Sequence, residues 1–222
     1  EDTMLGLAAG MMLAASAFSL ILPGLEAGAS ILGSEPLGAA VVVFGMALGV
    51  LMMLGLDEFT PHEHLGTGPC GAGHERCGRA WLFVFAIALH NLPEGVAIGV
   101  GYAGNEGMRA NALAMGIAIQ DVPEGLVVAV ALLAAGYRRA VAVGLGIASG
   151  LVEPVGAVLG AAVVGYSAAL LPWGLGFAAG AMLFVISHEI IPESHRKGHE
   201  AYATAGLMIG FVLMMVLDTA LG

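Results

Sequence analysis

Two short polar stretches interrupt long apolar runs: HNLPEG at residues 90–95 and QDVPEG at residues 120–125. In a helix, residues three and four apart lie on one face, so the polar members of each stretch would project to one side. The donors gathered this way are His90, Asn91, Glu94, Gln120, Asp121 and Glu124. Imidazole, amide and carboxylate groups together suit a divalent transition-metal ion. Pro93 and Pro123 each remove a backbone donor, which predicts a loosened helix beside these groups.

The charge distribution points the same way. Carboxylates near the centres of apolar runs come from Glu94, Asp121, Glu124 and Glu153. The basic residues all lie outside those runs: Arg76, Arg79, Arg109, Arg138, Arg139, Arg196 and Lys197. An unpaired carboxylate at the centre of a membrane costs about 2.5–3.5 kcal/mol, so the four cost roughly 10 kcal/mol or more. Protonation or a bound cation would remove this cost, and the neighbouring His, Asn and Gln favour a cation.

The elements that hold these residues are predicted from composition. The chain has 222 residues, of which 59% are hydrophobic and 11% charged, with a mean hydropathy of +0.92. This predicts an all-α polytopic membrane protein, a single transmembrane domain over residues 1–222. Seven apolar runs are long enough to cross a bilayer, at about 4–23, 36–56, 80–101, 112–135, 140–165, 173–191 and 201–221. No basic patch supports nucleic-acid binding.

Orientation follows from the basic residues. Six of the seven fall in the segments after the second, fourth and sixth runs, and Arg109 is the exception. The positive-inside rule therefore places those segments, including the His-containing loop 57–79, in the cytoplasm. The two motif helices are consecutive and hence antiparallel, and the first and sixth runs each end with Ser, apolar residues and Pro. Both features suggest an inverted-repeat helix bundle with its metal site at the midplane.

HNLPEG followed by QDVPEG resembles the paired signature of the ZIP (Zrt-, Irt-like protein) divalent-metal transporters, closest to the bacterial GufA-like branch. Many members have His where this chain has Gln120 and Glu where it has Asp121. The resemblance implies eight helices, so the family's first helix would precede Glu1, and it implies a bacterial inner (plasma) membrane location. It also implies a two-metal site with Glu94 and Glu124 shared. One position would use His90, Glu94, Gln120 and Glu124, and the other Asn91, Glu94, Asp121, Glu124 and Glu153.

A second group of candidates lies toward the cytoplasmic side. We interpret His188, Glu189, Asp57, His62 and His64 as an exit pathway or an accessory metal site. Two plainer interpretations stay open, because His188 and Glu189 could simply face water and the loop could be a solvated linker. The assembly is also left open, with a homodimer as one alternative.

The predicted function is transport of divalent metal ions into the cytoplasm. Zinc is the first candidate for the transported substrate, followed by Cd²⁺, Fe²⁺ and Mn²⁺, and no catalytic cofactor is expected. The alternative is a proton- or sodium-coupled carrier of another solute, which would use the carboxylates but leave His90 without a role. An enzyme is not expected: His188-Glu189 starts like an HExxH zinc-protease motif, but its fifth residue is Pro192.

Overall fold

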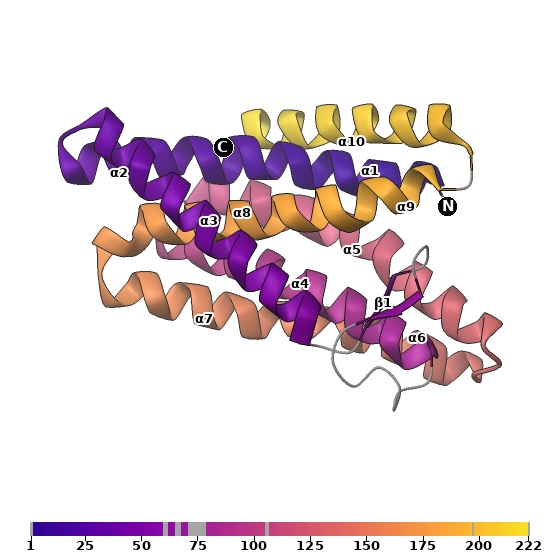
Figure 1. Ribbon diagram of the computed structural model, residues 1–222. Coiled ribbons are helices and arrows are strands. Elements are labelled where there is room, and N and C mark those ends of the chain that lie inside the picture. The colour runs from indigo at the N-terminus through magenta and orange to yellow at the C-terminus, as the bar shows by residue number, and fades with distance from the viewer. Residues whose placement is uncertain are drawn as a thin grey trace.

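The computed structural model describes residues 2–59, 62–64, 68–70, 79–104, 107–196 and 198–221. Within them the chain is a bundle of helices with one small hairpin (Figure 1). The helices are α1 (Asp2–Ala14), η1 (Ala15–Ile21), α2 (Leu22–Leu32), α3 (Glu35–Phe59), α4 (Arg79–Ala103), α5 (Gly107–Ala134), α6 (Arg139–Gly150), α7 (Val152–Tyr166), η3 (Ala168–Leu170), α8 (Leu171–Val185), η4 (Ile186–Ile190), α9 (Ile191–His195) and α10 (Glu200–Leu221). Seven helical spans among these residues are long and apolar enough to cross a membrane, which confirms the predicted fold class.

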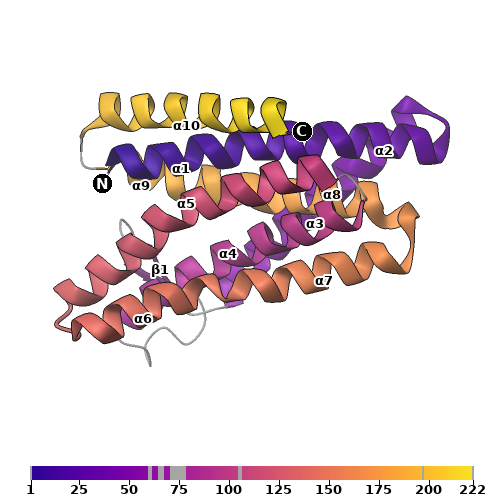
Figure 2. The ribbon, with the colours of Figure 1, turned by 180° about the vertical axis from the view of Figure 1, so that it is seen from behind.

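Several pairs of helices are packed by glycines on both partners. A Cβ at Gly6 of α1 would collide with the backbone of Ala203 in α10, and one at Gly206 of α10 would collide with the carbonyl of Thr3. Glycines that face a neighbouring helix backbone pack α3 on α8 and α4 on α7 in the same way. Helix backbones can approach this closely only where side chains are absent, as is common in membrane bundles. α1 and α10 accordingly lie side by side along their length in opposite views (Figures 1 and 2).

Two π-helical segments interrupt the first and sixth spans at matching places. η1 ends two residues before Pro23, and η4 ends two residues before Pro192. π-helical turns often lie at functional sites, and their occurrence at matching places fits an inverted repeat. By contrast, α4 and α5 continue through Pro93 and Pro123 without a break. The fifth span instead turns at Leu151, which separates α6 from α7.

The predicted loop 57–79 contains a β-hairpin. β1 (His62–His64) and β2 (Gly68–Cys70) form an antiparallel hairpin in which His62 is paired with Cys70. The side chains of His62 and His64 lie outside the described residues, so their predicted metal role stays a prediction. Asp57 belongs to the last turn of α3 rather than to the loop.

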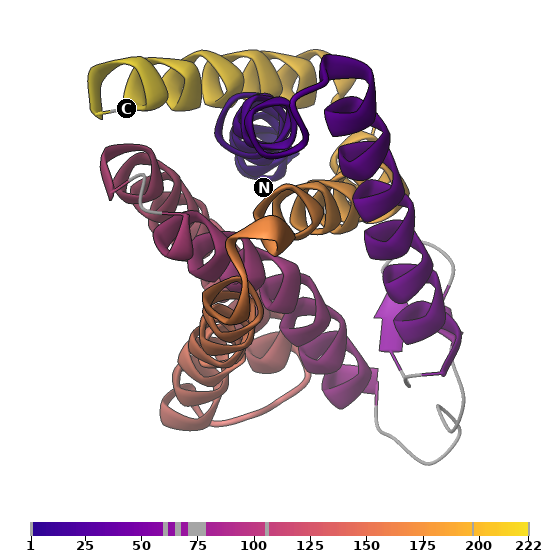
Figure 3. The same ribbon diagram turned by 90° about the vertical axis from the view of Figure 1, so that its left-hand side faces the viewer.

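The core lies where the first and sixth spans cross the bundle. Seen end-on, α1 and α8 lie between α10 on one side and α4 on the other (Figure 3). Their small and thioether side chains, including Met11, Met12, Ala178 and Met182, are fully buried. Large apolar side chains on the outer helices are exposed, such as Phe44 on α3 and Val158 on α7. These outer faces would contact lipid, so the polar groups of the two motifs are enclosed by the bundle.

Candidate metal site

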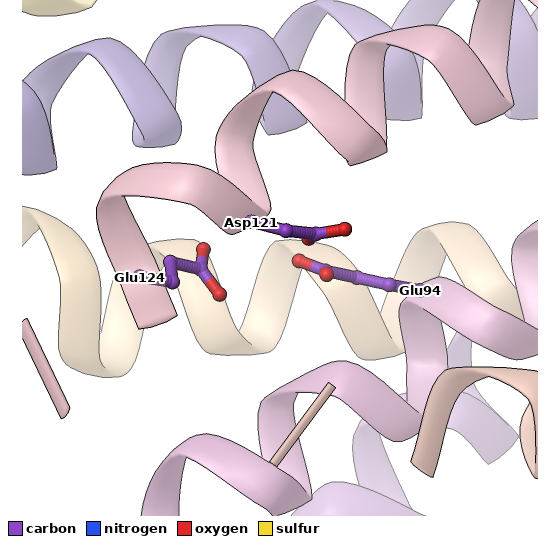
Figure 4. A group of neighbouring side chains, drawn as sticks. All are labelled: Glu94, Asp121 and Glu124. Atoms are coloured by element: carbon purple, nitrogen blue, oxygen red, sulfur yellow. The ribbon is translucent and has the colours of Figure 1, made fainter. Parts of the chain in front are cut away.

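Three carboxylates from the two motif helices meet inside the bundle. Glu94 comes from α4, while Asp121 and Glu124 come from α5, where their spacing of three puts them on one face. One ligand oxygen from each lies within 4.8 Å of the others. Figure 4 shows Glu94 pointing across the gap between the helices toward Asp121 and Glu124. Glu94 is fully buried and Glu124 is 7% exposed.

Most of the oxygens in this cluster have no hydrogen-bond donor. Among the described residues, buried acceptors without a partner are Asn91 Oδ1, Glu94 Oε2, Asp121 Oδ1 and both carboxylate oxygens of Glu124. A buried acceptor without a donor is costly, and a buried carboxylate more so. The cluster is therefore chemically suited to bind a cation or protons.

Two amide side chains border the cluster, and each is oriented by one hydrogen bond. Gln120 Nε2 donates to Glu94 Oε1 over 2.6 Å, which joins α5 to α4. Asn91 Nδ2 donates to the backbone carbonyl of Ser149 over 3.1 Å, at the end of α6. Because its nitrogen is used in this way, the oxygen of Asn91 remains as an acceptor. Both amides were predicted as ligands, but neither of these partners was foreseen.

Glu153 reaches the cluster from the fifth span. It lies in the first turn of α7, directly after the turn at Leu151, and its carboxyl lies near that of Asp121. A Cβ at Gly95 would clash with the Glu153 backbone, so α4 and α7 touch at this point. The structure thus brings Glu153 beside the carboxylates of both motifs.

His90 contacts Glu189, which was predicted to belong to the exit pathway or to an accessory metal site. Its Nε2 lies 2.6 Å from Oε2 of Glu189, which η4 carries into the bundle. Glu189 therefore contacts the candidate site itself, and the alternative that it only faces water does not hold. His188 is half exposed, stacks on Phe184 with ring centroids 4.9 Å apart, and has its Nε2 3.9 Å from Asp57 Oδ2.

This architecture defines a polytopic helical membrane protein with an acidic cluster enclosed between its helices. The sequence model of the ZIP zinc transporter family matches residues 63–218. The chain is 60% identical over its full length to the zinc transporter ZIPB of Bordetella bronchiseptica, covering 72% of that protein. It is 47% identical over 98% of its length to the zinc transporter GufA of Myxococcus xanthus, covering 85% of that protein. The chain belongs to the ZIP family, whose members are transporters and not enzymes.

Proposed function

We propose that this protein moves divalent metal ions, zinc foremost, across the bacterial inner membrane into the cytoplasm. The observation that carries the proposal is the cluster of Glu94, Asp121 and Glu124, whose buried oxygens include several without a hydrogen-bond donor. A divalent ion would supply the positive charge that no Lys or Arg within the apolar runs provides. Such a site must remove water from the ion and still release it.

The donor set supports a transition metal over calcium or magnesium. Carboxylate oxygens alone would suit the hard ions, whereas the imidazole of His90 suits zinc and its neighbours. The relatives ZIPB and GufA are both named zinc transporters, which favours zinc as the main substrate. Cadmium, iron and manganese are chemically similar candidates for the same site.

We further propose two metal positions that share Glu94 and Glu124. The first would add His90 and Gln120, and the second would add Asn91, Asp121 and Glu153. Of the five buried acceptors without a donor among the described residues, three belong to the shared Glu94 and Glu124, and the other two belong to Asn91 and Asp121 of the second position. His90 and Gln120 of the first position already contact Glu189 and Glu94. Two ions about 3.5–4 Å apart repel each other, so filling both positions would help release one of them.

Release toward the cytoplasm would involve Glu189. For the metal to bind His90 through Nε2, the contact with Glu189 must open, and when the ion leaves this contact can form again. Glu189 therefore competes with the metal for His90 and favours release. The next polar groups on this path would be His188, one residue before Glu189, and Asp57, at the end of α3.

Zinc uptake into proteoliposomes tests the proposal. The wild-type protein should take up zinc, whereas Glu94→Gln and Glu124→Gln should each lower the initial rate by at least about tenfold, since each removes a shared ligand. Glu200→Gln is the matched control, because Glu200 is exposed at the start of α10, outside the candidate site. Absence of zinc uptake by folded wild-type protein would refute the proposal.

The rival function, a proton- or sodium-coupled carrier of another solute, makes a different prediction. A carrier of that kind needs no transition metal, so zinc would leave its melting temperature unchanged. A metal transporter should be stabilised by zinc, by about 2.7 kcal/mol at one hundred times the dissociation constant.

A further inference from the structure

The fifth membrane span is interrupted beside the candidate metal site. α6 ends at Gly150, α7 begins at Val152, and Leu151 between them donates its N–H to the carbonyl of Ala148 over 3.1 Å. Pro154 accounts for this break, because its nitrogen carries no hydrogen and its ring displaces the carbonyl four residues earlier, which is that of Gly150. Within the first turn of α7 the missing N–H costs little, since N–H groups there have no partner in their own helix. The break therefore follows from a single residue.

The end of α6 at this break holds the side chain of Asn91. In an uninterrupted helix the carbonyl of Ser149 would accept from the N–H of residue 153, four residues later. In the structure this carbonyl accepts from Asn91 Nδ2 over 3.1 Å, and Asn91 and Ser149 are both buried. A carbonyl can only accept a hydrogen bond, so the amide turns its nitrogen toward Ser149 and its oxygen away from it. The contact therefore fixes which way round the amide lies.

This orientation decides whether Asn91 can bind a metal ion. Its Oδ1 is buried without a hydrogen-bond donor among the described residues, and Asn91 lies three residues before Glu94, on the same face of α4. A reversed amide would present its N–H groups, which repel a cation. We propose that Pro154 is a positioning residue: the break that it imposes frees the carbonyl of Ser149, which holds the Asn91 amide with its oxygen available to a divalent ion. This inference rests on the proposed transport function.

The surroundings of Pro154 indicate that it acts through the backbone. Its side chain is exposed, so its replacement leaves no cavity. The start of α7 is held on α4 by direct backbone contact, because a Cβ at Gly95 would clash with the Glu153 backbone and one at Gly156 would clash with the carbonyl of Leu92. A substitution that closes the break should therefore act mainly on the end of α6, where Asn91 is bound.

The test is the zinc affinity of the purified full chain, measured by competition with a fluorescent chelator. Pro154→Ala restores the N–H that the carbonyl of Gly150 lacks, which favours a continuous helix and withdraws the carbonyl of Ser149 from Asn91. The variant should bind zinc about fivefold more weakly, the effect of one lost hydrogen bond. In the Asn91→Ala background the same substitution should cause no further loss, since no amide remains to be oriented. Pro36→Ala is the matched control, because Pro36 is also an exposed proline in the first turn of a helix, α3, and should leave the affinity unchanged.

The double-mutant cycle separates positioning from general support of the fold. Equal losses of affinity in the wild-type and Asn91→Ala backgrounds would overturn the proposal, because a merely structural role of Pro154 would act on both alike. Unchanged affinity in folded Pro154→Ala would also overturn it. Pro154→Ser, which restores the same N–H, takes its place if Pro154→Ala does not fold. If folded wild-type protein bound no zinc, the proposed function would fail as well, whereas zinc binding by wild type without coupling between the two positions would remove the positioning inference alone.

Discussion

Glu124 offers a direct test of the idea that buried carboxylates await a cation. Both of its carboxylate oxygens are buried without a donor, and a charge in this setting costs about 2.5–3.5 kcal/mol. The substitution Glu124→Gln would remove the charge but leave a buried amide with imperfect partners, at about 1–2 kcal/mol. We therefore expect this variant to stabilise the metal-free protein by about 1–2 kcal/mol. At roughly 2–4 °C per kcal/mol for a chain of this size, its melting temperature should rise by about 2–8 °C.

Excess zinc should reverse the order of the two melting temperatures, so that the wild type melts above Glu124→Gln. Wild-type protein at one hundred times its dissociation constant gains about 2.7 kcal/mol, whereas the variant lacks a shared ligand and should gain little. Thermal unfolding in detergent, first with a chelator and then with excess zinc, measures both states. Glu200→Gln should follow the wild type in each. The reasoning is refuted if Glu124→Gln melts below wild type in the chelator, because the buried carboxylate would then be stabilising without any metal.

Two further predictions concern the neighbours of the cluster. Glu189→Gln weakens the contact that competes with the metal for His90, so zinc should bind about fivefold to tenfold more tightly and leave more slowly. Competition with a fluorescent chelator measures the zinc affinity. Weaker binding by the variant would mean that Glu189 is itself a ligand. Gly95→Ala drives a methyl group into the Glu153 backbone and should cost about 1–3 kcal/mol of stability by thermal unfolding. Gly144→Ala, with open space around it, should be neutral or mildly stabilising, and equal losses in both variants would contradict the packing argument.

The helices and the acidic cluster could be predicted because they depend on local pattern. Apolar runs of sufficient length predict spans, and spacings of three and four on a helix bring Asp121 and Glu124 to one face. The pairing of the two motif helices followed from their direct succession in the chain. The loosening expected at Pro93 and Pro123 does not interrupt either helix, since neighbouring helices can stabilise a backbone that proline deprives of one bond.

The contacts that orient the site could not be predicted, because each depends on how distant spans pack. Asn91 donates to Ser149, which lies 58 residues later, and the sequence offers many carbonyls of equal chemistry. The approach of Glu189 to His90 requires the π-helical turn η4, and no local pattern in Ile186–Ile190 distinguishes that turn from an ordinary helix. The hairpin within the 57–79 loop likewise depends on a strand pairing, His62 with Cys70, that composition does not indicate.

These contacts converge on α4, and each involves a different partner element. His90 is engaged by η4, Asn91 by α6, and Glu94 by Gln120 of α5. Each contact uses one polar atom of the α4 residue, so the atoms that remain are those available to a ligand. Asn91 and Glu94 each keep an oxygen without a hydrogen-bond donor, whereas His90 Nε2 is in contact with the carboxylate of Glu189. An arriving ion would therefore meet oxygens without a hydrogen-bond donor at the proposed second position but must displace Glu189 at the first. This difference favours occupation of the second position before the first.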